Sequence, residues 1–298
     1  MMISIFTFIS SAKESNQEDQ SVQEEKYKQK DTAEQEEGCD MVSVNNIEDK
    51  ITKVINKEYE IKNVSQLTNF AMSIKTVGIV LKPSDDADMK INATYSITAS
   101  SKEEVEKIAN VVSVTNAVNG NTCSLDIVSS EDGTNMWTWL KNEVKDSALG
   151  VELIVYVPDN FNDYSLINYC GDIEVNSLSG DFSIQSKTGT VKLKDTIIYG
   201  NCLVTTNTGS IQWDLNHDTS EDAVVTFNTD TGSVLCDMNA VLGHSMNLSI
   251  KSVTGSIVIK APNYDIVYNK NTKVQLDCIL DNMCKLTAKT TTGTIKIN

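Results

Sequence analysis

The second half of the chain alternates apolar and polar residues around a six-residue phrase that occurs five times. The phrase reads Ser/Thr-x-Thr-Gly-Ser/Thr-Ile/Val, and its copies are residues 186–191, 206–211, 229–234, 252–257 and 290–295. Counted from the glycine, the residues at −7, −5, +2 and +4 are apolar in every copy. Because side chains alternate between the two faces of a strand, this pattern predicts a strand with one buried face on each side of a tight turn. Glycine suits a turn that needs a positive φ.

The spacing of the copies predicts a repeat architecture. The glycines are Gly189, Gly209, Gly232, Gly255 and Gly293, so successive copies lie 20, 23, 23 and 38 residues apart. Two degenerate copies, at 169–175 and 178–184, carry Gly-Asp instead of Gly-Ser/Thr. About 20 residues fit two short strands and two turns, which is one rung of a β-solenoid. A ladder of hydroxyl groups would then bracket the turns, formed by Thr188, Thr208, Thr231, Thr254 and Thr292.

A β-sandwich is the alternative architecture, in which each phrase would join two antiparallel strands of a hairpin. We favour the solenoid because a sandwich gives no reason for the same hydroxyls to recur at every corner. The fold class expected is therefore mainly β, a solenoid-like stack of two-strand rungs preceded by a strand-rich segment with short helices.

The glycine turns, together with the phrase VELIVYVPDN at 151–160, resemble the putative-adhesin family of β-strand-repeat domains. The resemblance covers about residues 58–298 and is specific for architecture. It implies an all-β repeat domain of bacterial and archaeal surface proteins, with cell-envelope or extracellular placement and no catalytic residues to carry over. The long last interval departs from the pattern through an insertion of about 15 residues, which disturbs the regularity of the last rung.

The N-terminal residues predict export and a tether. Residues 1–12 contain a short apolar run followed by Ser-Ser-Ala, which is too short to span a bilayer and has the length of a signal-peptide core, although its positive start is missing. Residues 13–40 are nearly free of apolar side chains, which predicts a disordered acidic tether. Cys39 lies far from the apolar run, so it is not expected to carry a lipid.

Residues 41–157 are expected to mix strands with short helices and to cap the repeats at 158–298, hiding an edge that would otherwise template aggregation. The pattern at 45–55 fits a helix, with strand as the alternative, and residues 70–81 and 89–99 read as paired strands. Ser101 begins a capping box for a helix through Asn110. Asn119-Gly120 fits a hairpin turn, residues 136–148 a second short helix and residues 151–157 a strand.

Charge limits the partners. The chain holds 41 acidic and 25 basic residues, and all of the basic residues are lysine. A net charge of −16 without arginine argues against nucleic acid and anionic lipid, because phosphate binding needs basic side chains.

Histidine and cysteine offer little chemistry. His217 and His244 are expected in exposed loops, without a nucleophile or acid at motif spacing. Of the seven cysteines, Cys170 is expected in a strand or turn, and Cys202 and Cys236 fall on apolar columns as small core residues. Cys278 and Cys284 bracket a five-residue loop and could close a disulfide in an exported protein.

Two acidic loops are candidate calcium sites, Asn216 to Asp222 and Ser84 to Asp88. Neither has a glycine-turned calcium loop, so solvated turns are expected. Asp172 and Asp181 follow the glycines of the degenerate copies and are the one carboxylate pair that could serve a glycosidase; solvent-facing turn acids are the simpler interpretation.

The sequence favours a non-enzymatic surface or envelope module that acts in adhesion or scaffolding through a repeated β face. The alternatives are a polysaccharide-acting enzyme on a β-helix, or an envelope-stress sensor that binds a protein partner. No catalytic, cofactor-binding or metal-binding residues are predicted, and no cofactor. The expected partner is a surface glycan or protein, with no transmembrane span, and the expected location is extracellular or in the cell envelope.

Overall fold

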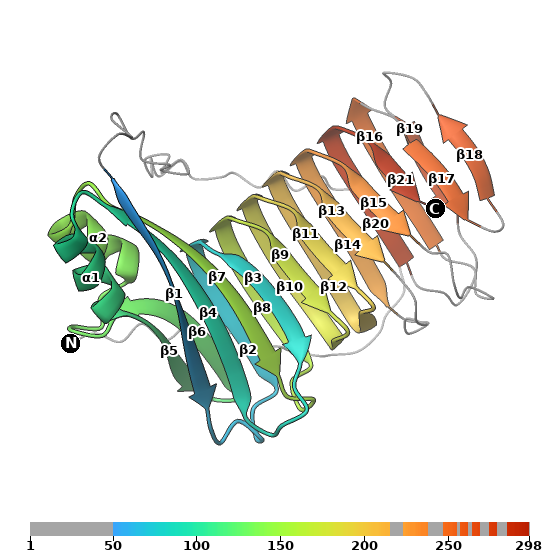
Figure 1. The fold of residues 1–298 in the computed structure, drawn as a ribbon. Helices are drawn as coiled ribbons and strands as arrows, with labels where there is room; N and C mark the ends of the chain where they lie inside the picture. Colours follow the sequence, from blue (N-terminus) through green and yellow to red (C-terminus); the bar gives the residue numbers. More distant parts are fainter. Residues whose placement is uncertain are drawn as a thin grey trace, which may run out of the picture. The chain divides into compact units, whose positions relative to one another are not determined.

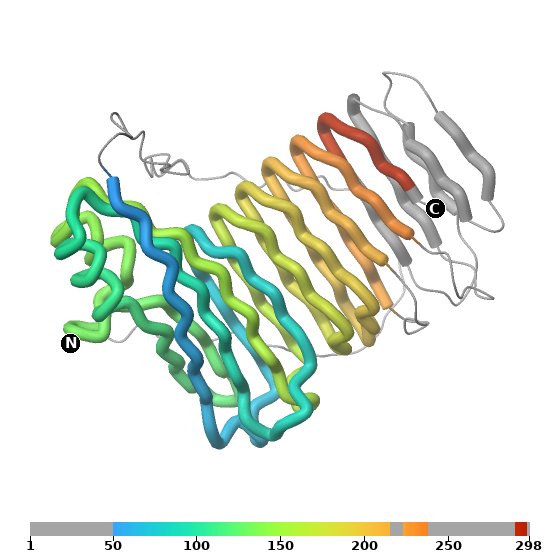
Figure 2. The backbone as a smooth tube through the Cα atoms, viewed as in Figure 1, coloured from blue at the N-terminus to red at the C-terminus, as the bar shows by residue number. Residues whose placement is uncertain are grey.

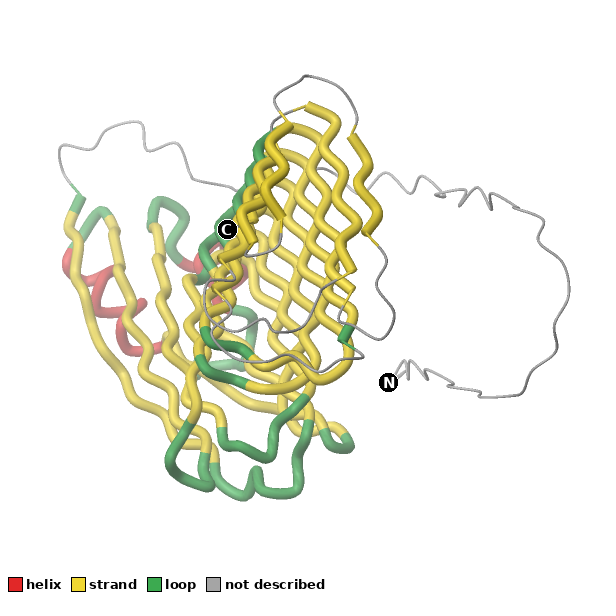
Figure 3. The backbone as a smooth tube through the Cα atoms, turned by 90° about the vertical axis from the view of Figure 1, so that its right-hand side faces the viewer, coloured by secondary structure: helices red, strands yellow, loops and turns green. Residues whose placement is uncertain are grey.

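The computed structural model describes residues 50–214, 223–237, 247–254, 257–261, 264–268, 274–278 and 285–297. The chain divides into two units, Met1–Gly38 and Cys39–Asn298, and every described residue belongs to the second. This unit is mainly β, with two helices among its described residues, and Figure 3 shows both helices (red) within a chain dominated by strands. In the described part of the chain, no helix is both long enough and apolar enough to cross a membrane.

The strands form two mixed sheets (Figure 1). Sheet A has the order β1-β4-β7-β3-β9-β11-β13-β15-β21-β17-β18, and sheet B has the order β19-β16-β20-β14-β12-β10-β8-β2-β6-β5. The elements before the repeats are β1 (Ile51–Ile61), β2 (Asn69–Thr76), β3 (Gly78–Pro83), β4 (Met89–Ala99), α1 (Lys102–Val111), β5 (Val112–Asn119), β6 (Thr122–Ser129), α2 (Met136–Glu143) and β7 (Ala148–Val157). The later strands are β8 (Asp163–Cys170), β9 (Ile173–Asn176), β10 (Ser179–Thr188), β11 (Val191–Lys194), β12 (Ile197–Thr208), β13 (Ile211–Asp214), β14 (Val224–Thr231), β15 (Val234–Asp237), β16 (Asn247–Thr254), β17 (Ile257–Ala261), β18 (Tyr264–Tyr268), β19 (Val274–Cys278), β20 (Lys285–Thr292) and β21 (Ile295–Ile297).

Each repeat contributes one strand to each sheet. The strand before the glycine lies in sheet B and the strand after it lies in sheet A, so the glycine turns a corner between two layers. Equivalent strands pair in parallel, with Thr188 opposite Thr208, Thr208 opposite Thr231 and Thr231 opposite Thr292. The alternative of a hairpin at each phrase is therefore wrong, and the expected alignment of the corners is confirmed for these copies. Figure 2 shows the strands of the aligned repeats lying side by side.

The corners depend on glycine because successive corners touch. Gly209 has φ +155°, and a Cβ added to it would lie 1.9 Å from the carbonyl oxygen of Gly189. A Cβ on Gly232 would lie 1.8 Å from the carbonyl oxygen of Gly209, and one on Gly293 1.6 Å from that of Gly232. No side chain fits at such distances, so the repeated glycine is dictated by the close approach of one corner to the next.

The repeats do not stack in chain order. Strand β20, which leads into the fifth copy, lies between β14 and β16, and β21 lies between β15 and β17. The fifth copy is thus inserted between the third and the fourth. All copies share one apolar pattern, so any copy fits beside any other. The long last interval supplies the chain length for this return: β18 pairs antiparallel with β17, and β19 pairs antiparallel with β16.

Three of the N-terminal strands, β1, β4 and β7, pair antiparallel, and two predictions for the N-terminal part are wrong. Residues 50–55 do not form a helix, because Ile51–Ile61 is strand β1, paired antiparallel with β4 along its whole length. Residues 70–81 are not one strand paired with 89–99: Val77 and Gly78 turn the chain from β2 in sheet B to β3 in sheet A. Strand β4 pairs instead with β1 and β7, since β7 lies between β4 and β3.

The other two predicted helices are present. Ser101 caps α1 by accepting a hydrogen bond from the backbone N–H of Glu104 at 3.2 Å, while the Glu104 carboxylate accepts one from the N–H of Ser100. The hairpin after β5 is also present, but its two loop residues are Gly120 and Asn121, one position later than predicted, because Asn119 pairs with Thr122. Helix α2 ends at Glu143, and strand β7 already begins at Ala148.

The interior is one apolar cluster that reaches from Ile61 to Ile295. It contains the inward side chains of the repeats, including Phe182, Trp213 and Phe227, and those of the N-terminal strands, such as Tyr95. The columns read from the sequence thus form a continuous core in the described part of the chain. Cys202 and Cys236 are buried at 1% exposure, which confirms that they are core residues.

Candidate functional site

The outer face of sheet B carries large apolar side chains in the repeat region. Ile167 and Tyr169 on β8, Tyr199 and Leu203 on β12, and Val224 on β14 are between 37% and 56% exposed. We call these five residues the outer patch. They point outward because their neighbours along each strand, such as Leu166 and Val204, fill the core.

The strand register places the members of the outer patch along a diagonal. Ile167 lies opposite Gln185 of β10, and Leu203 lies opposite Ser183 of the same strand. Val224 lies opposite Asn201, two residues before Leu203. The patch therefore crosses four neighbouring strands and is interleaved with polar side chains of β10, from Asp181 to Lys187. An exposed apolar group with polar surroundings is typical of a binding surface.

A β-bulge shapes one end of the outer patch. Three residues of β12, Tyr199 to Asn201, stand opposite the single Asp181 of β10, between the pairs Gly180–Ile198 and Phe182–Cys202. The Asp181 carboxylate accepts hydrogen bonds from the N–H groups of Gly200 at 2.8 Å and Asn201 at 3.1 Å. Two otherwise unpaired donors of the bulge are satisfied in this way, which fixes the backbone on both sides of Gly200.

Asp163 stands beside Asp181 on the next strand. Partial burial, and secondly the negative charge of Asp181, raise the pKa of the Asp163 carboxyl above its ordinary value. This carboxylate pair was missed by the sequence interpretation, because Asp163 belongs to no glycine phrase. Only the parallel register of β8 and β10 brings the two acids together.

The pair considered from sequence, Asp172 and Asp181, is not brought together. Asp172 lies at the corner after β8, where its carboxylate accepts a hydrogen bond from the N–H of Thr190 at 2.7 Å. Asp181 is the first residue of β10 that pairs with β8, seven residues before the Thr188 that pairs with Cys170. At about 3.3 Å per residue the two acids are roughly 23 Å apart, far beyond the roughly 5–10 Å that separates glycosidase carboxylates. The pair therefore cannot form a glycosidase site.

The bonded ladder of hydroxyls lies two residues before the predicted one. Thr188, Thr208, Thr231 and Thr292 form a column at the corner but are exposed. The buried column is Ser186, Thr206, Thr229 and Thr290. In it, Thr229 donates to the carbonyl of Gly209 at 2.9 Å, Thr206 donates to Thr229 at 2.9 Å, and Thr290 donates to the carbonyl of Gly232 at 3.2 Å. The hydroxyls of Thr206, Thr229 and Thr290 thus link the corners at Gly209 and Gly232 to the neighbouring strands, whereas the Ser186 hydroxyl makes no hydrogen bond.

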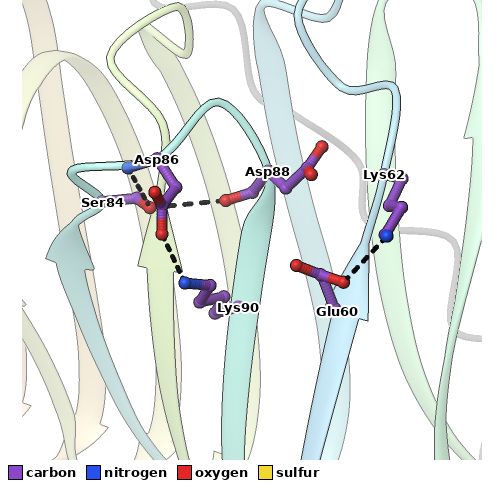
Figure 4. A network of polar contacts seen from close by, with 6 residues as sticks. All are labelled: Glu60, Lys62, Ser84, Asp86, Asp88 and Lys90. Carbon is purple, nitrogen blue, oxygen red and sulfur yellow. Dashed lines mark hydrogen bonds and ion pairs between the residues drawn. The ribbon is translucent and has the colours of Figure 1, made fainter.

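The loop at Ser84 to Asp88 does not gather its acids around one point (Figure 4). Asp86 forms an ion pair with Lys90, while the Ser84 hydroxyl donates to the backbone carbonyl of Asp88 and accepts from the N–H of Asp86. Across the described ranges, no three His, Cys, Asp or Glu side chains are grouped so that they could hold a metal ion.

Several predicted features lie outside the described residues: His217, His244, the acidic loop at Asn216 to Asp222, and Cys284 with the loop it shares with Cys278. Cys170 is described and is disulfide-bonded, which the sequence interpretation did not foresee. It pairs in register with Thr76 and with Thr188, so it occupies the corner column that is threonine in the later repeats.

No family model matches the chain, and no curated protein matches it. Three solved structures are similar at low identity. A "putative cell adhesion protein" from Clostridium sporogenes is 15% identical with a TM-score of 0.40, over 83% of this chain and 99% of that chain. A "putative adhesin" from Bacteroides fragilis is 14% identical with a TM-score of 0.29, over 83% and 97%. A "putative lipid binding protein" from Parabacteroides distasonis is 11% identical with a TM-score of 0.21, over 82% and 97%. These low values leave the function to be argued from the residues of this chain.

Proposed function

We propose that this protein is a non-enzymatic surface module of the cell envelope that binds a protein partner through the outer patch, in adhesion or scaffolding. The repeats at 158–298 would act as a β-solenoid that displays this face, residues 41–157 as its cap, and residues 13–40 as a tether behind an export signal at 1–12. The observation that carries the proposal is the set of five exposed apolar side chains on β8, β12 and β14 of sheet B.

The chemistry of the outer patch favours a protein. Ile167, Leu203 and Val224 offer aliphatic surface, which gains free energy when it meets apolar groups and offers nothing to the hydroxyls of a sugar. Tyr169 and Tyr199 add large amphipathic side chains of the type enriched at protein interfaces. The charge of −16 disfavours an anionic partner.

A surface glycan is the second candidate, because one observation supports it. Tyr199 lies two residues before Asn201 in the bulge of β12, so an aromatic side chain and an amide occur within one short stretch. The alternative of a polysaccharide-acting enzyme loses its only proposed acid pair, since Asp172 and Asp181 lie far apart. An envelope-stress sensor would use the same protein-binding face and differs only in what its partner does.

The test is the binding of the fluorescently labelled full chain to intact bacterial cells, with and without protease treatment of the cell surface. The double variant Tyr199→Ser with Leu203→Ser is expected to bind at least ten times more weakly. The control is Val54→Ser with Val118→Ser, which removes two apolar side chains that are at least as exposed from the edge strands β1 and β5. Loss of binding after protease treatment supports a protein partner, and survival points to the glycan. Equal binding by both double variants would remove the outer patch from the function.

A further inference from the structure

Strand β5 is an edge strand of sheet B and contains no charged residue. Its sequence is VSVTNAVN, although 22% of the residues of the chain are charged. It pairs antiparallel with β6, and within the described part of the chain no strand pairs with its other side (Figure 1). An edge strand presents a row of backbone N–H and C=O groups to other chains, and charges or prolines usually block this pairing. Strand β5 carries neither.

The nearby edge of sheet A is protected. Strand β1 carries Lys53 and Lys57 on one face and Glu58 and Glu60 on the other. The Lys57 ammonium donates to the carbonyl of Val112, the first residue of β5, at 2.6 Å. This bond occupies the beginning of β5. The rest of the strand is open, since every residue from 115 to 119 is exposed.

The hairpin decides which backbone groups of β5 face the open side. Asn119 and Thr122 flank a two-residue loop, so they form a hydrogen-bonded pair, and such pairs alternate with non-bonded pairs along the hairpin. The N–H and C=O groups of Val114, Asn116 and Val118 therefore point away from β6. Among the described residues, no hydrogen bond from outside the hairpin reaches the backbone of Asn116 or Val118. These groups can pair with another strand.

The side chains of β5 show that the core face is open at this edge. Val118 lies opposite Cys123, and Asn116 lies opposite Leu125, so all four side chains share one face. Cys123 and Leu125 are buried at 0% and 3% exposure, whereas Val118 is 56% exposed. A further strand beside β5 would cover Val118 and extend the apolar layer.

We propose that β5 pairs antiparallel with β5 of a second copy of this chain, around a two-fold axis at Asn116. Asn116 then lies opposite Asn116 of the second copy, and Val114 lies opposite Val118 of the second copy. Each of these pairs exchanges two backbone bonds, so the two strands share about six. Sheet B becomes continuous through both copies.

A second copy suits β5 because the strand is complementary to itself. Valine meets valine on the core face, and Thr115 meets Ala117 of the second copy on the other face. No like charges face each other along the strand pair. This is decisive in a chain of net charge −16, whose copies repel one another at most other surfaces. Two-fold pairing is also the commonest symmetry of protein dimers.

The dimer is weak because its interface is small. One pair of strands of this length covers less than the roughly 1,200–2,000 Å² of a standard interface, so we expect half-dissociation at about 0.1 mM. Copies crowded on one surface would still pair, because their local concentration is high. The proposal does not depend on the outer patch. Labelled chain at nanomolar concentration is monomeric, so Val118→Ser remains a valid control for cell binding.

Sedimentation velocity of the full chain tests the proposal, with thiols alkylated so that no new disulfide links the copies. Wild type should pass from monomer to dimer between about 5 µM and about 500 µM. Val118→Lys should stay monomeric, because a charge would stand against Val114 of the second copy, while the exposed position tolerates lysine in the monomer. The matched control is Val54→Lys on β1, where valine is 61% exposed; it should dimerise like wild type. A monomeric wild type, or a Val118→Lys variant that dimerises equally, overturns the proposal.

Hydrogen exchange locates the interface. In peptides that cover β5, the amide hydrogens should exchange about three times more slowly at 500 µM than at 5 µM, because most copies are then paired. Peptides from β1 should exchange equally at both concentrations. If concentration protects β1 or the strands of the outer patch and leaves β5 unchanged, the copies associate through another surface and the proposal is wrong.

Discussion

The N-terminal strands and the repeats build the same two sheets by opposite means. Strands β1, β4 and β7 pair antiparallel. Whether a side chain of these strands points inward or outward follows from the alternation along the strand. The repeats pair in parallel, and their glycine corners touch one another. The N-terminal part therefore depends on side chains and caps, whereas the repeats depend on the backbone at their corners.

The edge strands of the sheets also differ between the two regions. At the N-terminal end, the inward side chains of β1 include Lys53 and Lys57, of which Lys53 binds Glu106 of α1 at 2.8 Å and Lys57 donates to the carbonyl of Val112 at 2.6 Å. Burial lowers the pKa of Lys57. Charged groups on the inner face of an edge strand discourage pairing with another chain. At the other end, β18 and β19 add antiparallel strands to otherwise parallel stacks.

The largest effect is expected at a repeat corner. Gly209→Ala places a Cβ 1.9 Å from the carbonyl of Gly189 at φ +155°, so the corner must move or the chain fails to fold. We expect a loss of about 4 kcal/mol or more in the free energy of unfolding, measured by chemical denaturation. The matched control is Gly120→Ala in the β5–β6 hairpin, where φ is +58° and a Cβ added to the glycine would have no other atom within 4 Å. This variant should lose only about 1 kcal/mol in the free energy of unfolding. Equal losses of unfolding free energy in the two variants would show that the repeat corners do not depend on glycine more than the N-terminal hairpin does.

A smaller effect is expected in the buried hydroxyl column. Thr229→Val keeps the shape but removes the bonds to Gly209 and Thr206, and should cost about 1–2 kcal/mol in urea unfolding. Thr231→Val, two residues later on the exposed corner, should change stability by less than about 0.5 kcal/mol. If the exposed threonine proves the costlier one, the inner hydroxyls do not hold the corners together.

In the N-terminal part, the N-cap of helix α1 should contribute to the free energy of unfolding. Ser101→Ala removes the acceptor for the N–H of Glu104 and should cost about 1 kcal/mol. Because the core is one cluster, the loss should appear at Trp213 in the repeats as well. Fluorescence of a chain carrying Trp137→Phe and Trp139→Phe reports Trp213 alone. An unchanged unfolding midpoint at Trp213 would show that the two regions unfold separately.

The smallest effect is expected at Asp163. Its pKa is raised in the folded state, so the folded chain binds the proton more tightly and stability falls as the pH rises through the folded pKa. Asp163→Asn removes this penalty, and the variant should be a few tenths of a kcal/mol more stable than wild type at neutral pH. The difference should vanish below about pH 4, near the unfolded pKa. If Asp163→Asn were less stable than wild type at pH 7, the Asp163 carboxylate would stabilise the fold, contrary to the prediction.

The local sequence determined the elements of this protein. The period-two columns predicted the strands on both sides of every described corner, the glycine marked each corner, and Ser101 marked the start of α1, because these depend only on residues a few positions apart. The helix proposed at 45–55 is wrong for its described residues, 50–55, because the apolar residues of β1 fit either period, and pairing with β4 decided between them.

Tertiary structure decided which elements meet. The five copies carry the same apolar pattern, so nothing in the phrase itself could place the fifth copy between the third and the fourth; chain length and the antiparallel strands β18 and β19 did so. The outer patch and the Asp163–Asp181 pair likewise arise from the register between different strands of sheet B. Register across a sheet is a property of the packed core, and single strands do not encode it.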